Sequence, residues 1–417
     1  MSAVLFHEKY ISSDSFTYGW VYDQLSEKDL AFKTFINDNT IVDASSFDIS
    51  AGKGCFSEVF KITFATKEGP KYNTILKVPG SSIFEKAVNS SNNVDDSGNI
   101  FKNSAEMESG IVELHNREVD FYTKFSIEGI PIPEVFNATY WKPNIKQKGC
   151  LLMRDLDIDS KGVDLSQSLS ASQSLQIAEC IAKLQAYSIL NKEYVDSLNY
   201  KLPFRYVDFG PMVNCRLPAF INKFKDQLGE DALNVLKDGV DPKFEHFIDT
   251  KLCSFFNVPN VLSHSDCWTN NIAWLSDKYG NATSELKCIM DWQVLFSSNP
   301  ANDLARFMIL SLDGDIRRKY SNAINQHYYK TLTNELAAKN VAVPFTYENY
   351  EKVYSYNYIR QSVQLILMVS VFITHTNFDK DEENIRRAFS DKLILRTKHA
   401  LEDARVYMEQ ISGEWKE

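Results

Sequence analysis

Four polar residues in the second half of the chain have the types and spacing that phosphoryl transfer from a magnesium nucleotide requires. Asp266 lies two residues after His264, Asn271 follows five residues later, and Asp291 follows Asn271 by twenty residues within a short apolar run. The Asp266 carboxylate could orient an attacking hydroxyl and accept its proton, while the Asn271 amide oxygen and the Asp291 carboxylate could hold Mg²⁺. A lone His-x-Asp is usually structural, but the four residues together favour catalysis.

The chain further upstream contains a candidate phosphate-binding turn. Gly52, Gly54 and Ser57 form a Gly-x-Gly-x-x-Ser pattern that leads into a segment with alternating apolar residues. Glycine lets backbone N–H groups approach an anion without a clash at Cβ. Most glycine-rich hairpins are ordinary turns, so a phosphate role for these residues depends on a lysine strand and an acidic helix further along the chain.

Lys77 follows in the apolar segment 74–79. A lysine in such a strand needs a charged partner or must reach solvent. We expect its ammonium group to contact the α- and β-phosphates of ATP and to pair with Glu118, on a helix predicted over residues 113–125. Because spacing alone allows an error of one helical turn, three other acidic residues compete with Glu118: Glu108, Glu113 and Asp120.

Together these segments resemble the CHK kinase-like family, the ecdysteroid-kinase-like proteins of insects and nematodes, which are related to choline and aminoglycoside kinases. The resemblance is strongest to the nematode branch and runs from about Gly52 to about Phe307. The segments that carry it are Gly52-Lys-Gly54, Ile75-Leu-Lys77-Val-Pro79, His115-Asn-Arg-Glu118-Val-Asp-Phe-Tyr122, His264-Ser-Asp266-Cys-Trp268-Thr-Asn-Asn271-Ile-Ala-Trp274 and Met290-Asp291-Trp-Gln293.

The resemblance implies an α+β, two-lobed protein-kinase-like fold, with an N-terminal antiparallel sheet that carries one key helix and a mainly helical C-terminal lobe. We place the nucleotide-binding lobe at residues 1–156 and the catalytic and substrate-binding lobe at 157–417. Residues 1 to about 45 are expected to be helical. Residues 81–110, rich in Ser, Asn, Asp and Gly, are expected to form a flexible insertion.

Several residues have supporting roles in this interpretation. Met153 and Asp155 lie in the segment that resembles the linker between lobes, where backbone groups would contact adenine. His264 is expected to orient the loop, and Asp303 either caps the helix that begins there or also braces the catalytic loop. The sequence departs from the family at Ser265, where relatives usually have Gly, and at Gln185, where many have His; the effect of either on activity stays open.

Composition limits the class of protein. A chain of 417 residues is too long for one simple core and suits two lobes. The net charge of −10 and the lack of a Lys/Arg-rich run disfavour a nucleic-acid partner. Seven scattered cysteines without a Cys-x-x-Cys motif, and an N-terminus without a signal pattern, favour the cytoplasm. The longest apolar run, residues 362–373, is shorter than the ~20 residues that span a bilayer, so we expect a buried helix.

The sequence therefore predicts an ATP- and Mg²⁺-dependent kinase that transfers the γ-phosphate to the alcohol group of a small molecule, with a sterol or xenobiotic as candidate acceptor. Asp291 is not followed by Asp-Phe-Gly or Ala-Pro-Glu motifs, which disfavours a protein substrate. Aromatic residues between 202 and 212 favour an apolar alcohol. The alternatives are a non-catalytic kinase-like ligand-binding protein and a choline or ethanolamine kinase with an aromatic cage. No membrane span and no protein partner are expected.

Overall fold

The structure, a computed structural model, describes residues 6–12, 15–50, 56–80, 104–202, 216–229, 232–375, 382–411 and 413–416. Gly52 and Gly54 lie outside the described residues, as do residues 81–103 of the expected insertion and nearly all of the aromatic segment. Contacts between Cα atoms divide the chain into two compact units. Of the described residues, those up to 80 and those at 104–125 and 132–159 form unit 1, and those at 126–131 and from 160 onward form unit 2.

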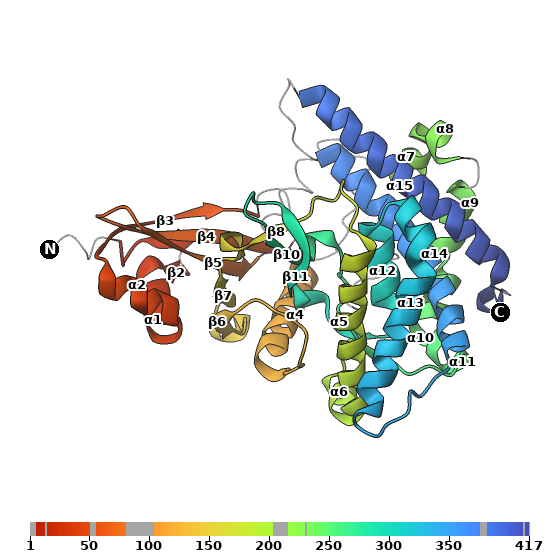
Figure 1. Cartoon of the computed structure of the whole chain (residues 1–417), viewed down its shortest axis with the longest axis horizontal. Helices are drawn as coiled ribbons and strands as arrows, with labels where there is room; N and C mark the ends of the chain where they lie inside the picture. Colours follow the sequence, from red (N-terminus) through yellow and green to blue (C-terminus); the bar gives the residue numbers. More distant parts are fainter. Residues whose placement is uncertain are drawn as a thin grey trace. The chain divides into compact units, whose positions relative to one another are not determined.

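Unit 1 is built on a five-stranded antiparallel sheet with the strand order β3-β4-β5-β7-β6 (Figure 1). Its strands are β3 (Ile41–Asp48), β4 (Ser57–Thr66), β5 (Lys71–Pro79), β6 (Val135–Thr139) and β7 (Cys150–Arg154), with a short pair β1 (Tyr10–Ser12) and β2 (Phe16–Thr17) before them. Helices α1 (Tyr18–Lys28) and α2 (Leu30–Asp38) contribute Val21, Leu25 and Phe32 to a core shared with Ile62 and Phe64 of β4.

Two expectations for this region are wrong. The chain is already in a strand from Ile41, because β3 pairs along its length with β4, and this tertiary pairing overrides local preference. The helix α4 (Ser104–Lys124) begins inside the region expected to be a flexible insertion. Residues 104–110 read Ser-Ala-Glu-Met-Glu-Ser-Gly, and Ala, Glu and Met are good helix formers.

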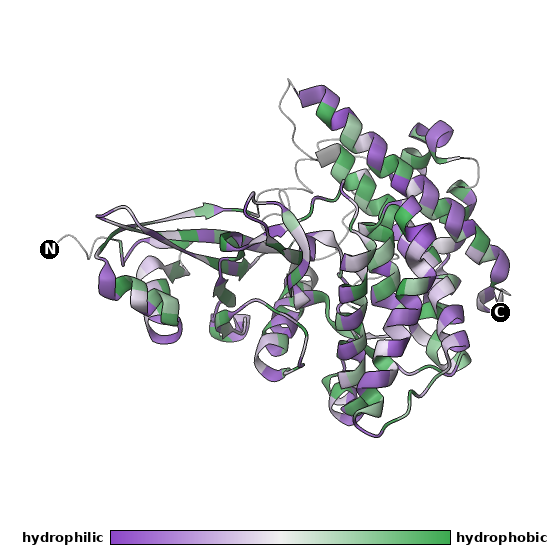
Figure 2. Ribbon diagram, viewed as in Figure 1, coloured by the Kyte–Doolittle hydropathy of each residue, from purple (hydrophilic) through white to green (hydrophobic). Residues whose placement is uncertain are grey.

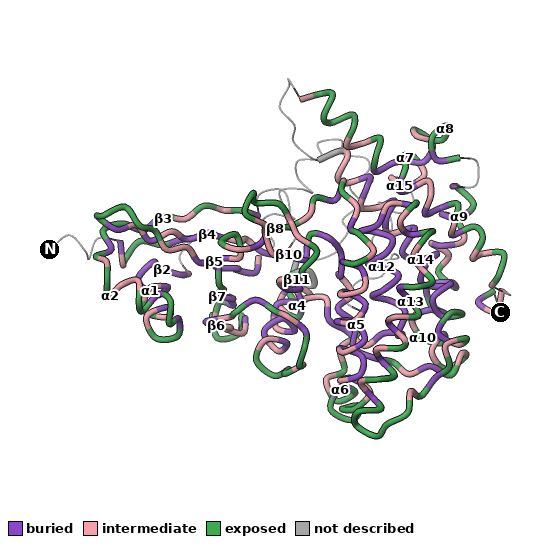
Figure 3. Tube along the Cα trace, viewed as in Figure 1, coloured by how far each residue is buried: buried purple, intermediate pink, exposed green. Residues whose placement is uncertain are grey.

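Unit 2 is mainly helical. Its helices are α5 (Ala171–Leu190), α6 (Lys192–Leu198), α7 (Leu217–Lys223), α8 (Lys225–Leu228), α9 (Ala232–Gly239), α10 (Pro242–Thr250), α11 (Leu252–Phe255), α12 (Asn302–Ser311), α13 (Gly314–Ala337), α14 (Tyr347–His375) and α15 (Glu383–Gln410). Helix α12 is buried over its whole length and packs against α14 (Figure 3). Both apolar and polar residues occur along these helices (Figure 2).

The predicted buried helix at residues 362–373 is confirmed as part of α14. Within the described part of the chain, no helix is long and apolar enough to cross a membrane. Short strands flank the segment 264–271, which holds the candidate catalytic residues. They are the pair β9 (Val261–Ser263) and β12 (Phe296–Ser298), and the sheet of β8 (Ser160–Gly162), β10 (Ile272–Ser276) and β11 (Ala282–Ile289).

The predicted fold class is confirmed: an α+β, protein-kinase-like fold with an N-terminal antiparallel sheet and a mainly helical C-terminal unit. In the chain order of unit 1, the helix α4 follows β5, which carries Lys77, and precedes β6 and β7. This is the order in which protein kinases place the lysine strand and the helix with its partner glutamate.

Candidate active site

A β-hairpin explains the twenty-residue spacing between Asn271 and Asp291. Strands β10 and β11 are antiparallel, and Ile272 pairs with Ile289 at the open end of the hairpin. Just beyond that pair, the Met290 N–H donates to the Asn271 carbonyl over 2.8 Å. The two candidate metal-binding residues therefore lie at the same end of one hairpin, although they are far apart in sequence.

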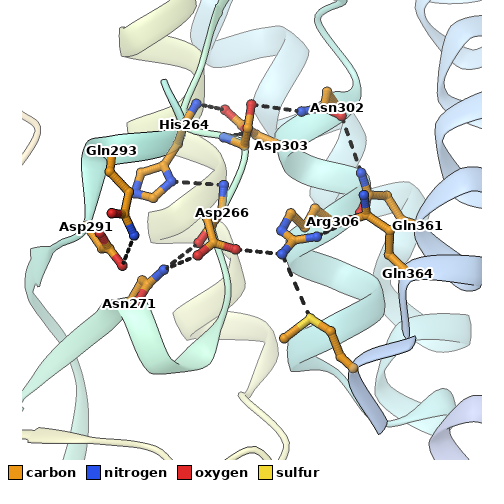
Figure 4. Close-up of polar contacts among 12 residues, drawn as sticks. His264, Asp266, Asn271, Asp291, Gln293, Asn302, Asp303, Arg306, Gln361 and Gln364 are labelled. Carbon is orange, nitrogen blue, oxygen red and sulfur yellow. Dashed lines mark hydrogen bonds and ion pairs between the residues drawn. The ribbon is translucent and has the colours of Figure 1, made fainter. Parts of the chain in front are cut away.

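Asn271 is oriented by Asp266 (Figure 4). Its Nδ2 donates to the Asp266 carboxylate oxygen Oδ2 over 2.8 Å and to the Asp266 backbone carbonyl over 2.9 Å. Because both acceptors need a donor, the amide nitrogen must face Asp266, and the amide oxygen of Asn271 is left for another partner. An amide oxygen beside a carboxylate such as Asp291 is a donor set that Mg²⁺ accepts.

Asp291 lies two residues after the end of β11 and has a left-handed conformation, with φ at +64°. Its Oδ2 accepts a hydrogen bond from Gln293 Nε2 over 3.2 Å. Ser265 is also left-handed, with φ at +65°, at the position where a glycine was expected in relatives. Such a conformation costs a non-glycine residue roughly 1–2 kcal/mol, and strained residues of this kind concentrate at functional sites.

His264 connects the loop to the hairpin. Its Nδ1 accepts from the Asp266 N–H over 3.2 Å, so Nε2 carries the proton and donates to the Met290 carbonyl over 2.9 Å. The ring also packs on Trp292, with 4.4 Å between ring centroids. Both ring nitrogens are thus engaged in holding backbone, and the residue orients the loop as predicted.

Asp303 is fully buried and accepts three hydrogen bonds from the catalytic loop. Its carboxylate receives Ser263 Oγ–H over 2.6 Å, the His264 N–H over 2.8 Å and the Ser265 N–H over 2.7 Å. It does not cap α12, whose first residue is Asn302 and whose N-terminus has no side-chain cap. Of the two roles considered for Asp303, the structure supports the brace and not the cap.

Arg306 is a site residue that the sequence prediction missed. Its Nη2 lies 2.5 Å from Asp266 Oδ1, and its Nη1 donates to the side-chain oxygens of Gln361, over 3.3 Å, and Gln364. The guanidinium group comes from α12, one turn after Asp303 (Figure 4). A signal was present, since an arginine within an apolar helix must have an acceptor nearby.

Gln185 supports the segment that leads into α12. It is fully buried in α5; its Nε2 donates to the Pro300 carbonyl over 3.0 Å, and its Oε1 accepts from the Tyr328 hydroxyl. Both ends of the amide are therefore used. The residue holds the chain just before Asn302 without needing to titrate.

In unit 1 the predicted pairing of Lys77 with Glu118 is confirmed. Lys77 Nζ lies 2.6 Å from Glu118 Oε2, and both residues are buried. The two nearest alternatives have other partners: Glu113 pairs with Arg117, and Asp120 pairs with Lys124. The predicted helix register is therefore correct.

Helix α4 is anchored to the strand region by two neighbouring side chains. His115 Nε2 donates to the Thr139 carbonyl over 2.9 Å, and Asn116 exchanges hydrogen bonds with the backbone N–H and carbonyl of Trp141. Burial, together with the nearby charge of Lys77, lowers the pKa of His115 from 6.5 to about 4. The imidazole is neutral at pH 7, so it can lie near the Lys77–Glu118 pair without adding charge.

The other residues predicted to bind the nucleotide lie in or near the sheet. Ser57 is buried at the start of β4, opposite Pro79. Met153 lies within β7, where its carbonyl accepts from Thr74 Oγ1 over 2.8 Å. The Asp155 side chain accepts from the Asp157 N–H and lies 2.9 Å from Lys61 Nζ, so its contacts are structural.

Comparison with known proteins places the chain in a family. Residues 38–410 match the model of the family DUF1679, described as "Uncharacterized oxidoreductase dhs-27". The protein of that name from Caenorhabditis elegans is 24% identical over 267 residues, which are 63% of this chain and 32% of that protein. The chain thus spans about a third of the length of this curated relative.

Two solved structures also align with most of the chain. One is a putative aminoglycoside phosphotransferase from Ralstonia eutropha JMP134, with 9% identity, 89% of this chain and 97% of that chain covered, and a TM-score of 0.40. The other is the GDP complex of wild-type aminoglycoside 2'-phosphotransferase-IIIa, with 11% identity, 92% and 98% coverage, and a TM-score of 0.39. Since the family model matches nearly the whole chain, the protein belongs to the DUF1679 family.

Proposed function

We propose that the protein is an ATP- and Mg²⁺-dependent small-molecule kinase of the CHK kinase-like type that transfers the γ-phosphate of ATP to an alcohol. The observation that carries this proposal is the cluster of Asp266, Asn271 and Asp291 at the end of the β10–β11 hairpin. Asn271 and Arg306 hold the Asp266 carboxylate, and Asp303 holds the backbone just before it, which supports the proposal.

Each residue has a distinct role in this mechanism. Lys77, held by Glu118, neutralises charge on the α- and β-phosphates. The Asn271 amide oxygen and the Asp291 carboxylate would hold Mg²⁺, which when bound would neutralise phosphate charge. The Asp266 carboxylate accepts the hydrogen of the acceptor hydroxyl and aligns its oxygen for in-line attack. Positioning and charge neutralisation account for most of the catalysis in such a site.

The surroundings of Asp266 favour an uncharged acceptor, such as a sterol or a xenobiotic alcohol. The Arg306 guanidinium lies against Asp266, and the α14 residues around Arg306 are the uncharged Gln361, Gln364 and Met368. These α14 residues offer no carboxylate to a quaternary ammonium or a polycationic acceptor. This favours an uncharged acceptor over choline or an aminoglycoside.

The oxidoreductase name of the C. elegans relative does not favour hydride transfer for this chain. That name describes a protein of which the chain covers 32%. Nicotinamide dinucleotides are typically bound by parallel βαβ units. Every strand pair in the described residues is antiparallel. A non-catalytic ligand-binding role is also disfavoured, because Lys77, Asp266, Asn271 and Asp291 are all present.

Two substitutions test the proposal together. Asp291→Ala should weaken ATP binding in the presence of Mg²⁺, measured by calorimetric titration with and without the metal. Asp266→Asn should reduce ADP release, measured with a metabolite extract as acceptor source, by on the order of 10²–10⁴ with ATP affinity little changed. Asp277→Ala, in the turn at the opposite end of the same hairpin, is the matched control. Identical ATP affinity with and without Mg²⁺ in both wild type and Asp291→Ala would refute the proposal.

A further inference from the structure

Arg306 holds the Asp266 carboxylate from the side opposite Asn271. Asn271 Nδ2 donates to Oδ2 over 2.8 Å, and Arg306 Nη2 lies 2.5 Å from Oδ1 (Figure 4). A carboxylate with one partner can rotate about its terminal torsion, which is broad. Two partners on different oxygens remove that rotation. Each oxygen still has a lone pair with which to accept a hydroxyl hydrogen.

Arg306 also joins Asp266 to α14. Its Nη1 donates to Gln361 and Gln364, and its Nη2 lies 3.8 Å from Met368 Sδ. These three α14 residues recur at helical spacing and lie on one face of the helix. Gln361 is buried, whereas Gln364 and Met368 are half-buried. The contacts of Arg306 therefore connect the Asp266 carboxylate with the half-buried residues of α14.

The arginine itself has little freedom. Arg306 is 8% exposed, and its Nε finds no hydrogen-bond partner among the described residues. Leaving a buried N–H unpaired is unfavourable, which indicates that the placement of the two terminal nitrogens determines the pose. A lysine could supply the charge but not contact both Asp266 and the α14 amides, because the three N–H donors of an ammonium share one nitrogen, whereas those of a guanidinium are spread over a planar fork.

We infer that Arg306 is a positioning residue that orients the Asp266 carboxylate for the acceptor hydroxyl and couples that orientation to α14. The inference rests on the proposed phosphotransfer. It assigns no direct contact with the reacting atoms to Arg306, whose effect passes through Asp266. It therefore differs from a simple stabilising ion pair, in which the arginine would affect folding but not the rate of the chemical step.

A double-mutant cycle on the full-length protein separates these two roles. The variants are Arg306→Gln, Arg306→Lys, Asp266→Asn and the double variant Asp266→Asn/Arg306→Gln. Gln364→Leu is added because it removes one of the α14 acceptors of Arg306 and leaves the contact with Asp266 in place. The control is Arg360→Gln, which removes a different buried arginine, on α14, that pairs with Asp249 over 2.7 Å. ADP release from Mg²⁺·ATP is measured with a metabolite extract as acceptor source, and urea unfolding is measured in parallel.

We expect Arg306→Gln to lower kcat 10- to 100-fold without changing the KM for ATP, with Arg306→Lys and Gln364→Leu intermediate and Arg360→Gln unchanged. In the Asp266→Asn background, Arg306→Gln should change kcat less than twofold, because its target carboxylate is gone. Multiplicative losses in the double variant, or a rise in the KM for ATP equal to the fall in kcat, would overturn the inference.

Failure of the proposed function gives a different pattern. Wild-type protein that binds no Mg²⁺·ATP and releases no ADP refutes the phosphotransfer itself. If the unfolding data still show coupling between Asp266 and Arg306 in that case, the arginine is a stabilising partner and the positioning role is overturned as well. Normal wild-type turnover with undiminished turnover in Arg306→Gln overturns the positioning role alone.

Discussion

Replacement of Asp303 by asparagine should destabilise the loop at residues 263–265, which donates hydrogen bonds to the Asp303 carboxylate. The wild-type carboxylate is fully buried and accepts from Ser263 Oγ, the His264 N–H and the Ser265 N–H. An asparagine has almost the same shape but one oxygen and one NH₂ group. Whichever way the amide is turned, its NH₂ group faces at least one of the two backbone N–H groups, and that donor loses its acceptor.

The structure gives a magnitude for this loss. A hydrogen bond to a charged acceptor contributes about 1.5–3 kcal/mol, and a buried donor left unpaired costs a further 1–3 kcal/mol. The loop should therefore be destabilised by about 2.5–6 kcal/mol. At 1.4 kcal/mol for each factor of ten, local opening should become on the order of 10²–10⁴ times more frequent.

Amide hydrogen exchange, followed by NMR or by mass spectrometry of peptides that cover residues 261–276, measures this opening directly. At least one of the His264 and Ser265 amides should exchange faster by that factor, and ADP release should fall with it. The matched control is Asp277→Asn, because Asp277 also accepts the N–H groups of Tyr279 and Asn281 but is only half-buried, in the hairpin turn. Unchanged protection of both loop amides in Asp303→Asn would refute the bracing role.

Three further predictions concern stability. Lys77→Met removes the ammonium that pairs with the buried Glu118 carboxylate and should lower the free energy of unfolding in urea by about 3–5 kcal/mol. The double variant Lys77→Met/Glu118→Leu should regain most of that stability, and equal losses in both variants would contradict the prediction. His115 has a pKa of about 4 in the folded protein, against 6.5 when unfolded. The stability that its neutral form contributes is therefore complete above pH 6.5 and is lost, by at most about 3 kcal/mol, as the pH falls towards 4. His115→Gln should flatten this dependence of stability on pH, and an unchanged slope would show that other groups cause it. The Ser265→Gly variant should be more stable than the Ser265→Ala variant by about 1–2 kcal/mol. Both variants lose the contact with Ser263 Oγ, but only glycine relieves the strain of the left-handed backbone at this position. Equal unfolding midpoints of the two variants would argue against that strain.

Much of the candidate site was visible in the sequence because it depends on local spacing. The interval between Asn271 and Asp291 is that of one β-hairpin, which brings its two ends together whatever its turn contains. The choice of Glu118 rested on the helical pattern around Tyr122, and the pair with Lys77 followed from placing that helix after the lysine strand. Each of these inferences needed only one element or two neighbouring ones.

The features that were missed depend on contacts between distant segments. A carboxylate at the start of a helix looks like a cap in sequence, but the donors to Asp303 lie in the segment 263–265, far upstream. Arg306 acquires its role from Asp266 on one side and from α14 on the other, and no spacing rule relates those three positions. The strand β3 likewise exists because β4 pairs with it.

Three carboxylates in this segment have distinct surroundings, and these surroundings separate their roles. Asp303 is sealed from solvent and saturated by loop donors, so it can brace but cannot meet a substrate. The Asp266 side chain is 21% exposed and is held on both oxygens by side chains, which suits a group that must present a lone pair in a fixed direction. Asp291 is half-buried in a left-handed conformation two residues beyond β11, and its Oδ2 accepts from the neutral Gln293 amide; the proposed function assigns this carboxylate to the metal. In the proposed function, the same residue type therefore serves as a brace, an orienting acceptor and a metal ligand at three positions, because burial and hydrogen-bond partners differ among them.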